Sequence, residues 1–376
     1  MTADPDTTAG MRILVAPDKF AGTLTAVQAA DAVVEGWRRA APADEVSTLP
    51  MSDGGPGFVH ALQSRLDGEL LAVSVSGPYG GRVPATVLVS AGTAYIEAAQ
   101  ACGLHLTPPD SRDPEHATSF GVGELIGAAV DAGASRVVVG LGGTASNDGG
   151  AGMLHALGAD ADVDLRGGVA ALSGLAEGST VDLTWARRRV DGLSLVAASD
   201  VDNPLLGLRG AINVYGAQKG VLDDRKYALD AALERYACAT DRSVADFPGA
   251  GAAGGLGFAL LVLGGTRQPG VELVADVLGL AARCRDVDLV ISGEGAFDYS
   301  SRAGKVVYGV AQVAGKAVRP CIVLAGRVDV GTREMRALGV EQAYSMVEKV
   351  GEARAFADPT GALEALAEHV AGQWSR

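Results

Sequence analysis

The sequence predicts an α/β protein in which both ends of the chain build one open parallel sheet and the middle forms an inserted second α/β domain of mixed sheet. Three observations lead to this fold class. Short apolar runs alternate with helix-like segments at both ends, whereas apolar runs joined by Gly/Pro turns occupy the middle. The length of 376 residues also exceeds that of one typical domain.

The N-terminal segment predicts strand, helix and strand in that order. Residues 12–16, RILVA, form a short apolar run of the kind found in buried parallel strands. Apolar side chains then recur at helical spacing over residues 24–37, with Thr23 or Thr25 as the N-cap. The run EVSTLP at residues 45–50 predicts the second strand.

The C-terminal segment repeats this alternation of strands and helices. The expected strands cover residues 286–295, 319–326 and 342–347, and the expected helices cover residues 304–317, 332–340 and 360–373. Because parallel strands need helical crossovers, the two ends together predict one parallel sheet.

The middle of the chain has a different pattern. Residues 73–90 and 93–98 have the alternation of antiparallel strands joined by Gly/Pro turns. A helix and a strand follow within residues 121–143, and residues 193–207 contain a strand that ends in an acidic loop. We therefore place the parallel-sheet domain at residues 11–70 and 284–376, and the inserted domain at residues 71–283.

Composition and charge exclude several classes of protein. A formal net charge of −14 without any basic run argues against nucleic-acid binding. The longest uncharged stretch is broken by glycines, which argues against a membrane span. The polar residues 1–10 are no signal peptide and predict a disordered leader. The four cysteines are widely spaced and predict reduced thiols in a cytoplasmic protein.

Five loops share one design, in which an apolar strand is followed by glycines, small polar residues and carboxylates. Their acids are Asp18, Asp53, Asp148, Asp200 with Asp202, and Glu294 with Asp298. In open α/β sheets ligands bind beyond the carboxyl ends of strands, and glycine lets backbone N–H groups approach phosphate oxygens. Carboxylates near phosphate call for a bridging Mg²⁺, and Lys219 and Lys305 supply positive charge. One such loop alone is more often a turn or helix cap, but five of one kind predict a phosphate-handling site.

Several well-known motifs do not occur in the sequence. There is no GxxxxGK[ST] P-loop, and the matches to the Rossmann fingerprint are weak. The histidines lack metal-ligand spacing, and no GxSxG nucleophile motif occurs. The glycine run from Gly249 to Gly257 fits a phosphate cradle and tight packing equally well. The residues alone therefore predict Mg²⁺-dependent phosphoryl transfer to a small molecule.

From Met11 onward, the sequence resembles the glycerate kinase type-1 family over nearly its whole length. The matching segments are ILVAPDKFAGTLTA, PMSDGG, GLGGTASNDGGAGML, ASDVDNPLLG, GAQKG, FPGAGAAGGLG and ISGEG followed by D and GK. Their order and spacing together are specific. The resemblance implies a flavodoxin-like domain formed by both termini that carries a second α/β domain. It also implies transfer of the ATP γ-phosphate to a hydroxyl of D-glycerate, with ATP and Mg²⁺ as cofactors and a homodimer left open.

The resemblance, carried over position by position, and our own interpretation of the loops together give a set of site residues, to which we assign roles; Lys19 and Arg302 in this set do not match the family's motifs. We expect Asp200, Asp148 and Lys305 to be catalytic, with Asp200 and Asp148 also holding the metal. Substrate binding is assigned to Asp18, Lys19, Asp53, Gly54, Gly55, Asn147, Glu294, Asp298 and Arg302. Nucleotide binding is assigned to Gly142, Gly143, Thr144, Gln218, Lys219, Gly254 and Gly255.

The chain departs from the family's common motifs at three loops. The common PDSFKGSL is altered by Lys19 and Ala21. The common DGGEGT is altered by Pro56 and Phe58, and the common GEGRxDxQ is altered by Ala296 and Ser300. Arg302 is a candidate replacement for the missing arginine, and a bulkier hydroxy acid is a candidate ligand beside Phe58.

Two hypotheses therefore stay open. The first is a kinase of D-glycerate or a related small 2-hydroxy acid. The second is a catalytically silent family member that binds a metabolite or nucleotide and regulates a partner. The altered loops favour the second, whereas the intact Asp148, Asp200, Glu294 and Lys305 favour the first.

Overall fold

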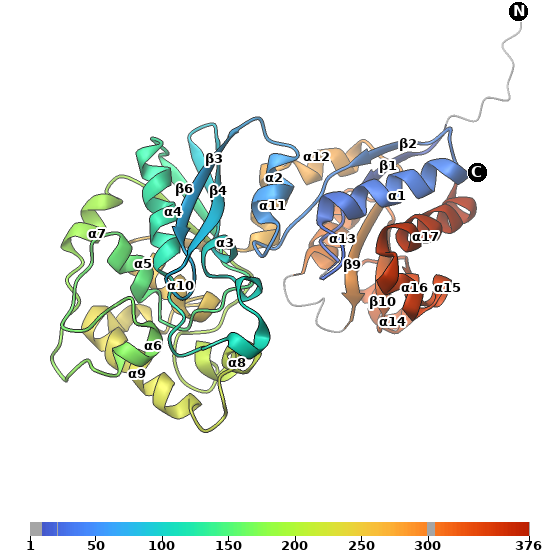
Figure 1. Ribbon diagram of the computed structural model, residues 1–376. Coiled ribbons are helices and arrows are strands. Elements are labelled where there is room, and N and C mark those ends of the chain that lie inside the picture. The colour runs from blue at the N-terminus through green and yellow to red at the C-terminus, as the bar shows by residue number, and fades with distance from the viewer. Residues whose placement is uncertain (1–9, 21, 299–304, 376) are drawn as a thin grey trace, which may run out of the picture. The chain divides into compact units, whose positions relative to one another are not determined.

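The computed structural model describes residues 10–20, 22–298 and 305–375, and the chain divides into two compact units (Figure 1). Unit 1 comprises Met1–Asp53, His60–Arg65 and Val271–Arg376, and unit 2 comprises Gly54–Val59 and Leu66–Gly270. The predicted leader, apart from Gly10, lies outside the described residues. The domain boundaries near residues 70 and 283 stay predictions.

Unit 1 is built on a parallel sheet. Its strands are β1 (Arg12–Val15), β2 (Glu45–Thr48), β9 (Leu289–Phe297), β10 (Cys321–Val328) and β11 (Gln342–Ser345). They lie in the order β11-β10-β9-β1-β2, and each neighbouring pair is parallel. Counted along unit 1, this is the 2-1-3-4-5 order of the flavodoxin-like fold, which confirms the predicted fold class.

The first and last helices of unit 1, α1 (Ala26–Ala40) and α17 (Pro359–Trp374), pack against one another (Figure 1). Thr25 is the N-cap of α1, because its hydroxyl accepts from the backbone N–H of Gln28, whose side chain accepts from Thr25 N–H. Trp37 is fully buried in the core below α1, and its indole N–H donates to Asp44 at 2.8 Å.

The remaining helices of unit 1 are short. They are α11 (Gly270–Val277), α12 (Leu280–Arg285), α13 (Val306–Lys316), α14 (Thr332–Ala337), α15 (Met346–Val350) and α16 (Glu352–Ala357), while α2 (Phe58–Gln63) contains residues of both units. The last strand ends at Ser345, two residues before its predicted end, because the Ser345 hydroxyl accepts from Glu348 N–H and caps α15.

Unit 2 contains a mixed sheet. Its strands are β3 (Glu69–Ser76), β4 (Arg82–Ser90), β5 (Thr93–Glu97), β6 (Arg136–Gly140), β7 (Ser194–Ala198) and β8 (Thr266–Gln268), in that spatial order. The pairs β3–β4 and β4–β5 are antiparallel, whereas the pairs from β5 to β8 are parallel. The mixed second sheet is thus also confirmed.

Helices pack around this sheet and enclose the core of unit 2. They are α3 (Ala98–Cys102), α4 (Phe120–Asp131), α5 (Ala151–Ala156), α6 (Gly168–Leu172), α7 (Thr184–Arg189), α8 (Ala211–Lys219), α9 (Lys226–Thr240) and α10 (Leu256–Val262). Short 3-10 turns span Leu104–Leu106, Pro109–Ser111, Arg242–Val244 and Ala252–Gly255. Val137 and Val139 of β6 are fully buried together with Leu125 of α4 and Phe258 of α10.

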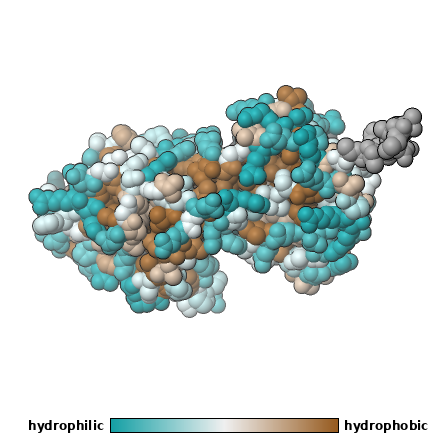
Figure 2. Space-filling view, turned by 90° about the horizontal axis from the view of Figure 1, so that it is seen from above, coloured by the Kyte–Doolittle hydropathy of each residue, from teal (hydrophilic) through white to brown (hydrophobic). Residues whose placement is uncertain are grey.

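The surface is mixed in character. The face seen in Figure 2 combines hydrophilic side chains with smaller hydrophobic patches. Among the described residues, no helix has the length and apolar character needed to cross a membrane. Several large apolar side chains are nevertheless exposed, including Trp185 at 64% and Phe356 at 66%.

Candidate functional site

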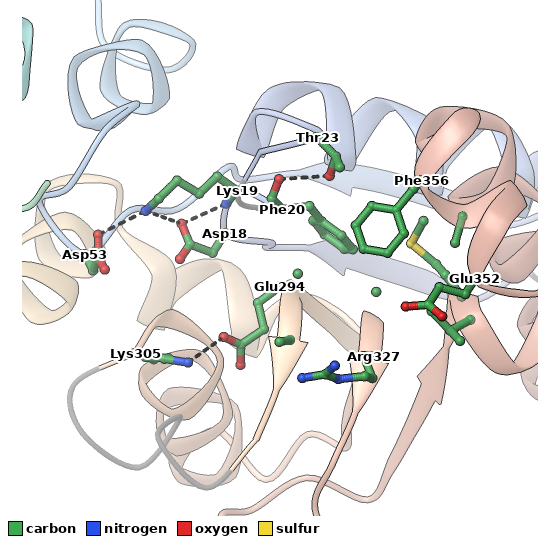
Figure 3. A pocket seen from close by; sticks show the side chains of 16 residues that line it. Asp18, Lys19, Phe20, Thr23, Asp53, Glu294, Lys305, Arg327, Glu352 and Phe356 are labelled. Carbon is green, nitrogen blue, oxygen red and sulfur yellow. Dashed lines mark hydrogen bonds and ion pairs between the residues drawn. The ribbon is translucent and has the colours of Figure 1, made fainter. Parts of the chain in front are cut away.

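A pocket of about 460 Å³ lies in unit 1 at the carboxyl ends of β1, β9 and β10 (Figure 3). Asp18 and Lys19 follow β1, Glu294 lies on β9, and Arg327 lies on β10. In a sheet of this strand order, the crevice at the point where the order reverses is the usual ligand site. The parallel sheet therefore places the pocket where ligands of this fold class bind.

One end of the pocket is charged. Lys19 Nζ lies 3.6 Å from Asp18 Oδ1 and 3.4 Å from Asp53 Oδ1. Lys305 Nζ lies 3.5 Å from Glu294 Oε2 and, outside the pocket lining, 3.7 Å from Asp298 Oδ1. Figure 3 shows Lys19 between its two acids, and Lys305 reaching Glu294. The structure thus brings six predicted substrate-binding or catalytic residues into one charged group in unit 1.

The environment of Asp18 disfavours its ionised form. Asp18 is 8% exposed, so burial raises the pKa of Asp18 to about 7, with Asp53 and Glu294 adding to the rise. Lys19 opposes the rise through its charge and through its backbone N–H, which donates to Asp18 Oδ1 at 2.8 Å. Asp18 therefore changes charge near neutral pH.

Asp18→Asn should make the protein more stable than the wild type at pH 8. The folded-state pKa of Asp18 lies above its unfolded value, so the folded state holds a proton that the unfolded state releases, and stability falls as the pH rises toward about 7. Asparagine removes this loss, and Lys19 keeps its ion pair with Asp53. Because wild-type stability already falls above the unfolded pKa of 3.8, thermal unfolding should show a small gain for the variant at pH 5 and a larger gain, of about 2–4 °C, at pH 8. A lower midpoint of the variant at both pH values would contradict the assignment.

The other end of the pocket is apolar, and the sequence analysis missed it. Phe20, Met346, Val347, Ala355 and Phe356 line it. Four of these side chains belong to α15 and α16, which follow β11. The only sequence signal for this apolar surface was the apolar pair at residues 346 and 347, which we predicted to be the end of a strand. Arg327, Glu352 and Thr23 add polar groups to the lining.

A second group of predicted residues lies in unit 2, at the carboxyl ends of β5, β6 and β7. The loop from Gly140 to Gly150 follows β6, and Asp200 follows β7 and is half-buried. Glu97 ends β5 and accepts hydrogen bonds from the backbone N–H groups of Gly57 at 3.0 Å and Val59 at 3.4 Å. Glu97 was not predicted, because no glycine loop follows it in the sequence.

Asp148 is fully buried and has four hydrogen-bond donors around its carboxylate. Ser119 donates from its backbone N–H and from its hydroxyl, each at 2.8 Å. Gly150 and Gly152 donate their backbone N–H groups at 3.1 and 3.2 Å. Burial still raises the pKa of Asp148, although these donors oppose the rise. This geometry joins the β6 loop to the start of α4 and gives Asp148 a structural role.

Asn147 and Lys219 are also buried. The Asn147 side chain donates to the carbonyl of Pro114 at 3.1 Å, and Lys219 Nζ donates to the carbonyl of Ser146 at 2.6 Å. Burial lowers the pKa of Lys219 to about 8. Gln218, the residue before it on α8, is exposed.

The predicted nucleotide-binding glycines have packing reasons to be glycine. A Cβ on Gly142 would lie 2.5 Å from the Cα of Gly55, and one on Gly254 would lie 2.0 Å from the carbonyl oxygen of Ser146. Gly149 N–H donates to the carbonyl of Gly254 at 2.9 Å. The same close approaches involve Gly54 with Ala198, Gly143 with Pro56, and Gly255 with Gly149. For the run from Gly249 to Gly257, the geometry favours tight packing over a phosphate cradle. The nucleotide-binding roles of these glycines and of the buried Thr144 stay predictions.

Of the altered positions, Lys19 lines the pocket, and Pro56 lies close to Gly143. Ala21, Ser300 and Arg302 lie outside the described residues. Phe58 is fully buried in an edge contact with Tyr95, so its ring faces protein and not the surface, and a bulkier acid beside it stays a prediction. Ala296 lines the pocket, and in the sheet its partner on β10 is Arg327, which lines the pocket as well.

The family of the chain follows from comparison with known proteins. A model of the glycerate kinase family matches residues 13–375. The glycerate kinase of Bacillus subtilis is 39% identical over 348 residues, covering 90% of this chain and 90% of the relative. The glycerate 2-kinase of Escherichia coli K12 is 39% identical over 352 residues, covering 91% of this chain and 92% of the relative. A crystal structure from Salmonella typhimurium LT2, provisionally assigned as glycerate kinase 2, has a TM-score of 0.80 at 38% identity and covers 96% of this chain and 98% of that one. The chain belongs to the glycerate kinase family, a family of kinases that act on an alcohol group.

Proposed function

We propose that the protein transfers a phosphoryl group from ATP to a hydroxyl of D-glycerate or a related small 2-hydroxy acid, with Mg²⁺. The observation that carries this proposal is the charged end of the unit 1 pocket, where Lys19 and Lys305 lie among Asp18, Asp53 and Glu294. Phosphoryl transfer depends on positioned positive charge more than on covalent chemistry. Lysine also suits a carboxylate substrate as a point charge. The names of the relatives support glycerate as the acid.

The unit 2 residues take different roles in this proposal. Asp200 is our candidate for the proton acceptor or the metal ligand, because it follows a parallel strand and the residue as a whole is only half-buried. Asp148 acts as a positioning residue, because four donors already surround its carboxylate. Lys219 holds the β6 loop through Ser146.

The residues fit Mg²⁺ bound together with a nucleotide. Within the described ranges, no three His, Cys, Asp or Glu side chains form a metal-binding group. Mg²⁺ in kinase sites needs only one or two carboxylates, since phosphate oxygens and water complete its ligands. Asp200 can supply such an oxygen, whereas Asp148 is a poorer donor. The bound ion would neutralise charge on the transferring phosphoryl group.

A silent binding protein is the second candidate, and Ala296 is the observation that favours it. At this pocket position the family's common motif has an arginine, and the chain has none. Arg327 weakens that argument, because it stands beside Ala296 in the sheet and lines the same pocket. We propose that Arg327, and not the predicted Arg302, replaces the missing cation.

The experiment that decides between the two functions measures ADP release from Mg-ATP with D-glycerate and a panel of 2- and 3-hydroxy acids. The kinase function predicts turnover with D-glycerate at a kcat of about 1–100 s⁻¹. Turnover with another acid alone would correct the substrate. ADP binding without turnover on any acid would establish the silent binder.

Our proposal also covers the cellular location of the enzyme and its binding partners. We propose a cytoplasmic protein whose partners are a nucleotide and a small hydroxy acid, and neither nucleic acid nor a membrane. The net charge of −14 supports the exclusion of nucleic acid. A homodimer stays a prediction.

A further inference from the structure

We propose that the apolar end of the unit 1 pocket, formed by Phe20, Met346, Val347, Ala355 and Phe356, binds the adenine base of the nucleotide. This inference rests on the proposed kinase function and extends it to the place where the base binds. It moves the base away from the glycine loops of unit 2, to which the sequence analysis assigned the nucleotide.

The size of the pocket is the first argument. Pockets of about 300–1,000 Å³ hold ligands of drug size, and this one has about 460 Å³. Glycerate is a three-carbon acid and fills a small part of such a volume. The pocket therefore has room for a larger ligand, and ATP is the larger of the two substrates of the proposed reaction.

The division of the pocket into two ends is the second argument. Acids and lysines gather at the ends of β1 and β9, whereas apolar side chains gather at α15 and α16. ATP has the same division, with a flat base at one end and a triphosphate at the other. A small hydroxy acid has no apolar part that would need five apolar side chains. With the base at the apolar end, the phosphates extend toward Lys19 and Lys305.

Phe356 gives the third argument. Its side chain is 66% exposed at the pocket, whereas Phe20 is 2% exposed and Met346 is 2% exposed. Figure 3 shows the rings of Phe20 and Phe356 next to each other at one side of the pocket. An exposed phenyl ring beside a buried one offers a face on which a flat base can stack and be shielded from water.

Polar groups at this end can orient a base. Glu352 and Arg327 line the pocket close to the apolar side chains (Figure 3). The Arg327 guanidinium is held by Asp329, with its Nε 2.5 Å from Asp329 Oδ2. Few polar groups among apolar ones are typical of sites that bind one ligand in one orientation.

The test compares binding of ADP with binding of tripolyphosphate, which has no base. Titration calorimetry would use the full-length wild type and the variants Phe356→Ala, Phe356→Leu and Phe247→Ala. Phe247 is the matched control, because it is 52% exposed in unit 2 and does not line the pocket. We expect Phe356→Ala to weaken ADP binding about tenfold and to leave tripolyphosphate binding unchanged. Phe356→Leu should lose most of the same affinity, because it keeps the apolar character but not the ring.

Each other outcome has a definite meaning. Equal ADP affinity in the wild type and Phe356→Ala, or no ADP binding by the wild type, would overturn the subsite. If Phe356→Ala raises the KM for the hydroxy acid and leaves the ADP affinity unchanged, the proposed base subsite is also overturned, and the apolar end is assigned to the acid. The ADP-release assay tests the kinase function separately: a wild type that binds ADP through Phe356 but turns over no acid would retain the subsite and lose the proposed reaction.

Discussion

Asp148→Ala should lower the free energy of unfolding of the protein by about 4 kcal/mol. The wild-type carboxylate accepts two hydrogen bonds from Ser119 and one each from Gly150 and Gly152, all in a fully buried place. Alanine leaves these donors without their acceptor inside the core of unit 2. Urea unfolding followed by circular dichroism would measure the loss as a lower midpoint.

Asp182→Ala is the matched control for this experiment. Its carboxylate likewise accepts a hydrogen bond from a backbone N–H, that of Thr184 at the start of α7, at 2.8 Å, but the side chain is exposed. Its unfolding midpoint should change much less, since water can replace the lost acceptor. An Asp148→Ala protein with the wild-type midpoint and no kinase activity would instead assign Asp148 to the chemistry, as the sequence analysis expected.

Asp200→Asn should reduce kcat by about 100-fold or more while leaving the fold intact. Asparagine keeps the shape of the side chain but can neither take up a proton nor hold a cation with a full negative charge. The side chain is half-buried at the end of β7, so the exchange creates no cavity. Steady-state ADP release would give kcat, and thermal unfolding should give a midpoint within about 2 °C of the wild type.

The loop of Asp200 contains its own control. Asp202 is 70% exposed and pairs with Arg267 at 2.7 Å, an ion pair of the surface type that contributes little to stability. Asp202→Asn should therefore keep both kcat and the midpoint. If Asp200→Asn retained wild-type turnover, the proton acceptor would have to be sought among the unit 1 acids, with Asp18 first because its pKa lies at about 7.

The sheets could be predicted because their strands are short apolar runs between turn residues. Val137–Val139 of β6 and Ile13–Val15 of β1 are buried, as continuous apolar runs suggest. The end of β11 could not be predicted in this way. Met346 and Val347 are apolar in either state, so only the cap made by Ser345 shows that a helix begins there.

The candidate site could be predicted in part for a similar reason. Asp18 and Glu294 each follow or lie on a strand, and strand order alone brings them to one edge of the sheet. Phe356 belongs to a six-residue helix without any motif, so nothing local marks it as a pocket residue. Asp148 shows a different limit: its donor Ser119 comes from a separate loop, and the sequence cannot distinguish a satisfied buried acid from a reactive one.

The strand order of unit 1 also has a consequence for synthesis on the ribosome. Strands β1 and β2 emerge early, but β9, which pairs with β1, follows roughly 240 residues after β2, and α17 is the last helix to appear. At about 5–20 residues per second, the N-terminal segment waits roughly 10–50 s for its partner strand. Unit 2 is complete in the nascent chain before that moment. The early apolar run Ile13–Val15, which is fully buried in the folded protein, is therefore without its partner strand for this interval, and we expect a chaperone to protect it during translation.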